Sequence, residues 1–277
     1  MLKFALCNEV FENQPWRDVV GAIAAAGYDG VEIAPFTLAD SVDDISPAER
    51  KTIREQAQDV GLDIAGLHWL FVSPTGLHAT TDDAATRQRT TAYMQSLIRF
   101  CGDLGGTIMV IGSPKQRNVQ PGVDYGVAWQ RFVDMIVACL DLATERGVTL
   151  CMEALPANQS NFVTTLDEAV NMVRKVNHSR FQNMFDVHNA CLETEPLPDL
   201  VRRYLPTIKH VHVNEMDGTY PGNRDFDFGS ILGVLQEARF QGYVSAEVFD
   251  YSRGATFIAR ATLEHLKDAQ RDTAQDR

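Results

Sequence analysis

Carboxylate side chains stand at the ends of three short apolar runs in the second half of this sequence. Glu153 closes the run in "CMEAL", Asp186 the run in "FDVHN" and Glu247 the run in "SAEVFD", while a fourth run, "HVHVNE", carries two histidines. A carboxylate among apolar neighbours is tolerated mainly when it is paired or binds a metal, and three on adjacent strands would repel one another without a cation. The pattern therefore predicts a divalent-metal site with three oxygen ligands and one imidazole. Such a set suits Mn²⁺, Mg²⁺ or Co²⁺ better than a thiolate-preferring ion.

Each of these positions on its own has a plainer interpretation. One glutamate at a strand end is most often a rim or capping residue, but four polar residues at four consecutive strand ends are hard to explain in that way. Alternate residues of a strand share a face, so Asp186 and His188 are predicted to point together. The same rule pairs His210 with His212. His210 lies two residues deeper, which favours a supporting role over contact with the metal.

A repeated unit of helix and strand surrounds these positions. Amphipathic helical stretches end in glycine and pass at once into a short β-branched or apolar run. Glycine tolerates the left-handed conformation just past a helix end, so each instance predicts a helix that hands over to a strand. The five glycines that mark such a handover are Gly27, Gly61, Gly105, Gly147 and Gly242.

Eight strands are predicted in this way, with helical stretches between them and after the last. They lie near residues 3–7, 30–35, 62–69, 107–113, 149–155, 182–188, 208–214 and 243–249. Eight alternating units without a break in composition predict an α/β fold, a single-domain (β/α)₈ TIM barrel over residues 1–270 with a polar tail at 271–277. The alternative, an open doubly wound sheet, would want a glycine-rich turn after the first strand, and "ALCNEVFENQPW" has none. In a TIM barrel the carboxyl ends of the strands carry the active site.

Composition excludes several classes of protein. The chain has 277 residues, 45% of them hydrophobic, and no apolar run is as long as a membrane span. A net charge of −12 without a basic stripe argues against nucleic acid as a partner. The start "MLKFALC" does not resemble a signal peptide, and five cysteines without a C-x-x-C pair favour reduced thiols. A cytoplasmic protein is therefore expected, with neither a membrane nor a nucleic-acid partner.

The motifs "MEAL", "FDVHN", "KHVHVNE…YPGNRDFDF" and "SAEVF", at these spacings, resemble one branch of the xylose isomerase-like barrels. This is the sugar isomerase and epimerase branch, which includes ketose epimerases of the D-tagatose 3-epimerase type and inosose isomerases. The resemblance covers nearly the whole chain. It implies that Glu153, Asp186, His212 and Glu247 bind the metal, with Mn²⁺ expected and Co²⁺ or Mg²⁺ as alternatives. It also implies that the two glutamates act as an acid/base pair on opposite faces of the substrate, and that His188 contacts a substrate oxygen.

This chain departs from the family pattern at the substrate end. Ketose epimerases often have Asp-x-x-His on the sixth strand, where this chain reads Asp186-Val187-His188. They tend to carry an arginine shortly after the seventh strand, where this chain reads "EMDGTY". A common glutamate after the strand-five ligand is replaced near Gln159, and a glycine after "PG" is replaced by Asn223-Arg224. The departures bear on the identity of the substrate rather than on the metal.

Further residues near the predicted mouth are candidates for substrate contact. Glu32 and His68 end the second and third strands, where they are expected to face the substrate or each other. Arg224 is the one cation well placed to meet an anion, whereas Lys115 and Arg117 are interpreted as solvated surface charges. Three aromatic residues are candidates for an apolar wall against a sugar face: Trp69, Phe71 and Phe226.

These residues predict metal-assisted proton transfer at a carbon next to a carbonyl group, through an enediolate. The expected substrate is a ketose, an inosose or a keto-sugar, and the resemblance favours a homodimer or homotetramer. Two alternatives stay open: a metal-dependent dehydratase or lyase that uses the same enolate on a keto-polyol, and a non-catalytic sugar-binding barrel.

Overall fold

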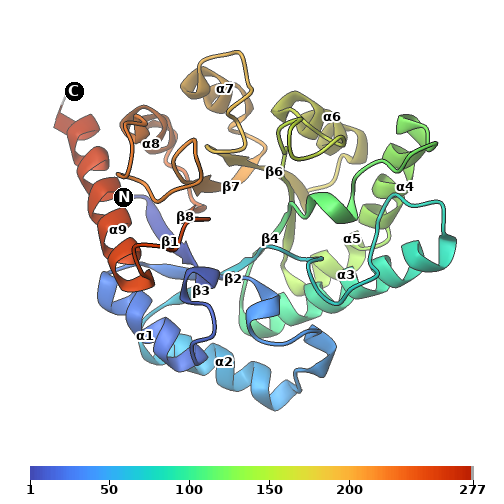
Figure 1. Cartoon of the computed structure of the whole chain (residues 1–277), viewed down its shortest axis with the longest axis horizontal. Coiled ribbons are helices and arrows are strands. Elements are labelled where there is room, and N and C mark those ends of the chain that lie inside the picture. The colour runs from blue at the N-terminus through green and yellow to red at the C-terminus, as the bar shows by residue number, and fades with distance from the viewer. Residues whose placement is uncertain (276–277) are drawn as a thin grey trace.

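The short apolar runs of the sequence become eight parallel strands that close into a barrel (Figure 1). The computed structural model describes residues 1–275. The strands are β1 Lys3–Cys7, β2 Gly30–Ile33, β3 Asp63–Leu67, β4 Ile108–Ile111, β5 Thr149–Met152, β6 Phe181–Asp186, β7 Ile208–Val213 and β8 Tyr243–Ala246. Each lies within or within one residue of its predicted range, and the predicted TIM barrel is confirmed. The runs are apolar throughout because the barrel interior covers one face of each strand and the helices cover the other.

Each strand pairs in parallel with its neighbours along the chain, and β1 also pairs with β8 to close the barrel. The register shifts twice, between Val31 and Glu32 on β2 and between Asn183 and Met184 on β6. Such irregularities re-aim the side chains that follow them and are frequent beside active sites. Here one precedes Glu32 and the other precedes Asp186, so both shifts lie on strands that carry candidate site residues.

The helices form a ring outside the strands (Figure 1). They are α1 Trp16–Ala26, α2 Pro47–Asp59, α3 Ala84–Leu104, α4 Tyr125–Val137, α5 Leu140–Arg146, α6 Leu166–Val176, α7 Leu197–Tyr204, α8 Phe228–Glu237 and α9 Ala255–Gln275. Gly27 ends α1 in the left-handed conformation, as its position predicted. Gly242 was misinterpreted as such a marker. Arg239 takes the positive φ after α8, whereas a Cβ at Gly242 would lie 2.3 Å from the carbonyl oxygen of Lys209.

Helix α9 closes the ring by packing beside α1. The Tyr28 hydroxyl donates to the carbonyl oxygen of Ala259 at 3.0 Å, and Lys267 Nζ donates to that of Gly27 at 3.1 Å. The helix continues to Gln275, so residues 271–275 of the predicted polar tail are helical. Residues 276 and 277, the last two of that tail, lie outside the described residues.

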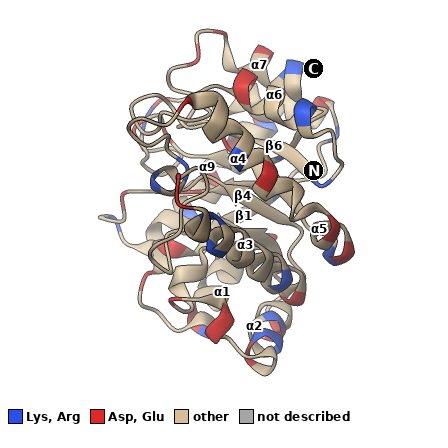
Figure 2. Cartoon of the chain, turned by 90° about the vertical axis from the view of Figure 1, so that its right-hand side faces the viewer, with Lys and Arg blue, Asp and Glu red and all other residues tan. Residues whose placement is uncertain are grey.

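Acidic and basic residues are interspersed over the outer helices in the view of Figure 2, as on α2, where both signs occur within one helix. None of the helices described combines the length and the apolar character that crossing a membrane would require.

The close approach of β3 and β4 gives a stability test. A Cβ at Gly66 would lie 2.0 Å from the carbonyl oxygen of Ile108, its register partner, so Gly66→Ala must push two strands apart. We expect a loss of about 1–3 kcal/mol of stability, typical of overpacking. Gly21→Ala is the control: it lies in α1 with no atom within 4 Å of an added Cβ, and it should stabilise by up to ~1 kcal/mol. Thermal unfolding followed by circular dichroism measures both, and equal midpoints for the two variants would contradict this prediction.

Candidate metal centre and substrate pocket

Four strand ends bring the predicted metal ligands together. Glu153 directly follows β5, Asp186 ends β6, His212 lies in β7 and Glu247 directly follows β8. Asp186 and His212 are register partners on adjacent strands, which places their side chains side by side. One ligand atom from each of the four lies within 4.8 Å of the other three, and all four side chains are buried. This grouping arises because the carboxyl ends of parallel strands meet at one end of the barrel.

The donor set of these four residues fits a divalent cation. His212 Nδ1 lies 3.2 Å from Glu247 Oε2 and 3.6 Å from Asp186 Oδ2. Within the described part of the chain, His212 Nδ1 and Asp186 Oδ2 are buried and have no hydrogen-bond partner. Burial, together with the charges of Glu247 and Asp186, raises the pKa of Glu153 to about 8. A cation among these oxygens would relieve that repulsion and give both orphaned atoms a partner.

Glu32 lies beneath this group and orients its histidine. Its carboxylate is 3.2 Å from His212 Nε2 through either oxygen and 2.7 Å from His210 Nε2. Burial alone would raise the pKa of Glu32, but the charges of His210 and His212 outweigh it and hold the pKa well below its usual value. An ionised Glu32 keeps the proton of His212 on Nε2 and leaves Nδ1 free to bind a metal.

The prediction that Glu32 contacts substrate is therefore corrected. The side chain is completely buried, and its two oxygens are occupied by the histidines of β7. The register shift just before Glu32 and its place inside the strand put the carboxylate below the mouth, where it supports the site.

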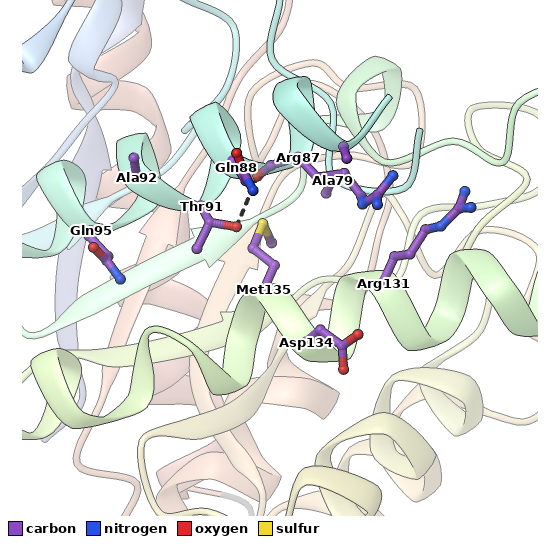
Figure 3. A pocket seen from close by; sticks show the side chains of 10 residues that line it. Ala79, Arg87, Gln88, Thr91, Ala92, Gln95, Arg131, Asp134 and Met135 are labelled. Atoms are coloured by element: carbon purple, nitrogen blue, oxygen red, sulfur yellow. Dashed lines mark hydrogen bonds between the residues drawn. The ribbon is translucent and has the colours of Figure 1, made fainter. Parts of the chain in front are cut away.

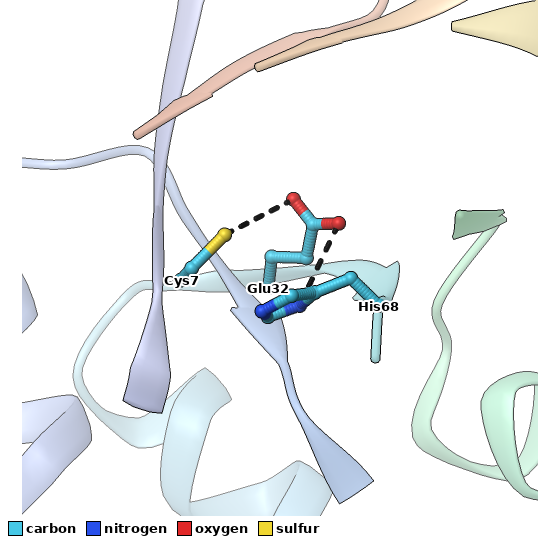
Figure 4. Close-up of side chains that lie close together, drawn as sticks. All are labelled: Cys7, Glu32 and His68. Carbon is cyan, nitrogen blue, oxygen red and sulfur yellow. Dashed lines mark hydrogen bonds and ion pairs between the residues drawn. The ribbon is translucent and has the colours of Figure 1, made fainter. Parts of the chain in front are cut away.

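Cys7 and His68 flank Glu32 on the two neighbouring strands (Figure 4). Cys7 Sγ lies 3.7 Å from Glu32 Oε2, and His68 Nδ1 lies 3.8 Å from Glu32 Oε1. The other ring nitrogen of His68 lies 2.9 Å from Glu9 Oε2. Burial alone would lower the pKa of His68, but Cys7 and the charge of Glu9 outweigh it and raise the pKa well above its usual value. A positive His68 between two carboxylates balances charge under the floor of the site.

A pocket opens above the four residues. It encloses about 390 Å³ of empty space, part of it open to solvent, which suits a small molecule. Apart from Val110 of β4, its lining comes from the segments after β3, β4, β5, β6 and β8, and it consists of His68, Trp69, Val110, Gly112, Ser113, Pro114, Glu153, Leu155, Gln159, Asn189, Glu247 and Phe249. This lining contains two carboxylates and no lysine or arginine. His68 lines the pocket, and its contact with a substrate stays a prediction.

One wall of the pocket is aromatic. The rings of Trp69 and Phe249 pack edge to face with centroids 6.4 Å apart. Of the predicted wall, only Trp69 takes part, because Phe71 is buried in the core and Phe226 packs on Phe228 instead.

Two pocket residues hold unusual backbone conformations. Trp69 has φ of 52° and Ser113 has φ of 29°, in a region that favours glycine. Ser113 Oγ accepts a hydrogen bond of 3.3 Å from the backbone N–H of Phe71, which ties the loops after β3 and β4 together. Strain of this kind persists where the surrounding structure enforces it, and it is common at ligand sites.

Neither His188 nor Arg224 is among the lining residues of this pocket, although the His188 ring packs edge to face on Phe249 of its wall, with centroids 5.5 Å apart. His188 donates from Nδ1 to the carbonyl oxygen of Met216 at 2.9 Å, and its Nε2 is 3.2 Å from Gln159 Nε2. Arg224 is exposed, and its Nε binds Asp217 Oδ2 at 2.8 Å. Residues 187–190 form a turn, so the alternation rule that paired His188 with Asp186 no longer applies there.

Several site residues escaped the sequence interpretation. Asn189 lines the pocket, and its amide donates to Glu153 Oε1 at 2.9 Å. Glu9 stands just after β1, where the strand-end rule applied to "ALCNEV" would have found it. Glu215 is buried and accepts backbone N–H groups of the loop after β7, which fixes that loop.

Arg117 was wrongly interpreted as a solvated charge. It is buried, and its Nη1 donates to the carbonyl oxygens of Ile111 at 3.0 Å and Glu153 at 2.7 Å. The guanidinium thus fastens the end of β4 to the end of β5. Lys115, two residues earlier, is exposed as predicted.

A second groove lies between α3 and α4, away from the carboxylates (Figure 3). Its two arginines are already engaged: Arg87 donates to the carbonyl oxygens of Thr81 and Asp82, and Arg131 pairs with Asp82. Its lining residues include no histidine, no cysteine and a single carboxylate, so the groove offers no comparable chemistry.

Comparison with known proteins identifies the type of barrel. A family model described as xylose isomerase-like TIM barrel matches residues 20–269, which is most of the chain. An L-ribulose 3-epimerase has a very similar fold, with a TM-score of 0.86 over 100% of this chain and 97% of that one at 17% identity.

Two relatives indicate the range of activities among similar sequences. The D-psicose 3-epimerase of Agrobacterium fabrum is 26% identical over 232 residues, which cover 82% of this chain and 77% of that protein. The inosose dehydratase of Klebsiella pneumoniae subsp. pneumoniae is 21% identical over 274 residues, which cover 86% of this chain and 84% of that protein. The relatives thus include sugar epimerases and a dehydratase.

The geometry predicts one divalent ion per chain. Elemental analysis after incubation with Mn²⁺ and desalting should find one equivalent, and chelation should lower the melting temperature by several degrees. At free metal 100 times Kd, binding stabilises by about 2.7 kcal/mol. Asp186→Asn should lose most of the metal, whereas Asp217→Asn, at an exposed carboxylate outside the group, should keep it. Equal metal content in the two variants would contradict the site.

Proposed function

Because the chain belongs to the xylose isomerase-like TIM barrel family, we propose that it is a divalent-metal-dependent sugar epimerase or isomerase. It moves a proton at a carbon atom next to a carbonyl group. The observation that carries the proposal is the convergence of Glu153 and Glu247 on one small pocket, beside Asp186 and the oriented His212. The epimerases among its relatives support the same reaction class.

Glu153, Asp186, His212 Nδ1 and Glu247 would hold the metal ion. When bound, a divalent ion polarises a carbonyl group and offsets the negative charge that develops on neighbouring oxygens. Mn²⁺ is the expected ion, because carboxylate oxygens with one imidazole suit it and no thiolate lies in the group.

The proton transfer itself belongs to the two glutamates. One of Glu153 and Glu247 takes the proton from the substrate carbon, which leaves an enediolate. In an epimerase the other glutamate returns a proton to the opposite face, and in an aldose–ketose isomerase the proton goes to the neighbouring carbon. Positioned acid/base groups of this kind contribute typically about 10²–10⁴-fold in rate. Both glutamates line the pocket, so both are within reach of a bound substrate.

Other residues of the site orient the His212 ring and limit the access of water. Glu32 and His210 hold the His212 ring, while Trp69 and Phe249 present an apolar edge that limits water at the reacting carbon. The substrate is a neutral ketose, inosose or keto-sugar, because the lining of the pocket offers carboxylates, amides, a serine and a histidine paired with Glu9, but no lysine or arginine.

A dehydratase is the second candidate, and the likeness to inosose dehydratases favours it. The same proton removal next to a carbonyl gives an enolate that can expel a hydroxyl group from the adjacent carbon. Mass spectrometry separates the two reactions, because an epimerase conserves substrate mass and a dehydratase releases water.

Substitution of the two glutamates tests the reaction. Glutamine keeps the size and one coordinating oxygen but cannot accept a proton as a carboxylate does. We expect Glu153→Gln and Glu247→Gln to keep most of the metal and the fold while losing turnover of D-psicose or another accepted ketose by at least about 10²-fold. Glu55→Gln, at an exposed glutamate of α2, should leave turnover unchanged. Near wild-type turnover by either site variant with metal bound would refute the two-glutamate mechanism.

The charge of the pocket predicts a preference among substrates. Since Arg224 is tied to Asp217 outside the pocket, a phosphate group would meet two carboxylates and no lysine or arginine among the lining residues. Positive charge there would come from the proposed metal and from His68, which is paired with Glu9. A free ketose should therefore have a higher kcat/KM than its phosphate ester. If the kcat/KM of the phosphate ester is tenfold higher than that of the free ketose, a difference of about 1.4 kcal/mol, the prediction is wrong.

A further inference from the structure

Asn189 contacts two of the carboxylates, one through its backbone and one through its side chain. Its backbone N–H donates to Asp186 Oδ1 at 2.9 Å, and its Nδ2 donates to Glu153 Oε1 at 2.9 Å. Asn189 itself is buried and lines the pocket. One residue of the turn after β6 therefore contacts a carboxylate on its own strand and another on the neighbouring strand.

The orientation of the Asn189 amide is fixed by a chain of hydrogen bonds. The carbonyl of Met216 can only accept, so His188 Nδ1 donates to it, which leaves Nε2 facing Gln159 Nε2. Gln159 Nε2, with two protons, donates to His188 Nε2 and to Asn189 Oδ1, both at 3.2 Å. With its oxygen occupied, Asn189 presents its N–H group to Glu153.

The other oxygen of Glu153 lies against a residue without a side chain. A Cβ at Gly112 would lie 2.1 Å from Glu153 Oε2 and 3.4 Å from its Cδ. Gly112 is not among the glycines with positive φ, so an alanine there is compatible with the backbone. Gly112 is needed because it has no side chain: the Glu153 carboxylate occupies the space that a Cβ would fill. Arg117 Nη1 donates to the carbonyl oxygen of Glu153 at 2.7 Å and so fixes its backbone.

From these contacts we infer that Asn189 and Gly112 are positioning residues for Glu153, which hold its carboxylate from both sides in the orientation that proton transfer needs. The inference rests on the proposed function, in which Glu153 is one of two proton carriers. Asn189 supplies a donor that fixes one oxygen, and Gly112 supplies the room that the other oxygen occupies. A reacting group displaced by about 1 Å can lose about 10²-fold in rate, so such a clamp matters.

A displaced Glu153 should affect the two epimers of a substrate differently, and this difference can be measured. Each glutamate takes the proton from one epimer of a pair. Asn189→Ala and Gly112→Ala should slow epimer formation about 10–100-fold. In D₂O with saturating Mn²⁺, the epimer deprotonated by Glu247 should still incorporate deuterium at near the wild-type rate while little product forms. The other epimer should show little incorporation. NMR with each epimer of an accepted ketose measures both quantities.

Two further variants serve as controls. Gln159→Ala removes the support of Asn189 but leaves its bond to Glu153, so it should show the same asymmetry in a weaker form. Gly21→Ala, on the outer helix α1, should match wild type in both measurements. An equal loss of deuterium incorporation from both epimers in Asn189→Ala and Gly112→Ala, or unchanged turnover, would overturn the positioning role.

A second readout does not depend on activity. Displacing Glu153, a proposed ligand, should weaken Mn²⁺ binding by about tenfold or more in Asn189→Ala, measured by isothermal titration calorimetry. A crystal structure of Gly112→Ala should show the carboxylate turned away. If the wild-type protein turns over no ketose, the proposed function fails, and these two measurements alone decide the positioning role. Unchanged Mn²⁺ affinity and an unmoved carboxylate would refute it.

Discussion

Three carboxylates and an imidazole crowd into one buried space at the mouth of the barrel, and the repulsion among the carboxylates is the constraint on which the site depends. Burial and the charges of Glu247 and Asp186 make Glu153 harder to ionise there, and so raise its pKa. The His212 ring faces this group through an unpartnered nitrogen. A cation held among the four would relieve this repulsion and give the unpartnered nitrogen a ligand, which is why we propose a divalent metal there.

Below that group, buried carboxylates are paired with histidines. Glu32 accepts from His210 and His212, and Glu9 pairs with a positive His68. Glu32 and Glu9 thus each have an imidazole beside them, which limits the cost of carrying ionisable groups in an apolar interior. The same contacts fix which nitrogen of His212 carries its proton. Charge compensation and preparation of the metal centre are therefore achieved by the same residues.

The side of the pocket away from the four candidate ligands is built differently. Amide and aromatic side chains line it, and the loops after the strands carry them. The strands fix the four candidate ligands, whereas loop residues such as Asn189, Gln159 and Phe249 decide what fits beside them. This division is typical of TIM barrels, in which loops vary on a constant frame. It is consistent with relatives that include both epimerases and dehydratases.

The sequence by itself determined the eight strands, the barrel and the grouping of Glu153, Asp186, His212 and Glu247. These features follow from short-range periodicity and from the rule that parallel strands bring their carboxyl ends together. Only the tertiary structure decided which neighbouring residues reach the pocket. The strand β6 stops at Asp186, and the turn that follows, closed by Ala190 N–H on the Asp186 carbonyl at 3.1 Å, brings in Asn189 instead of His188.

Depth and burial likewise depended on three-dimensional packing. Glu32 looked like a residue of the mouth, but a register shift and the histidines of β7 place it in the floor. Arg117 looked like a surface charge, yet its loop folds inward until the guanidinium meets two carbonyl oxygens at the ends of β4 and β5. Periodicity reports which residues share a face of an element. It does not report where a strand ends or how a loop packs, because contacts between residues distant in the sequence decide both.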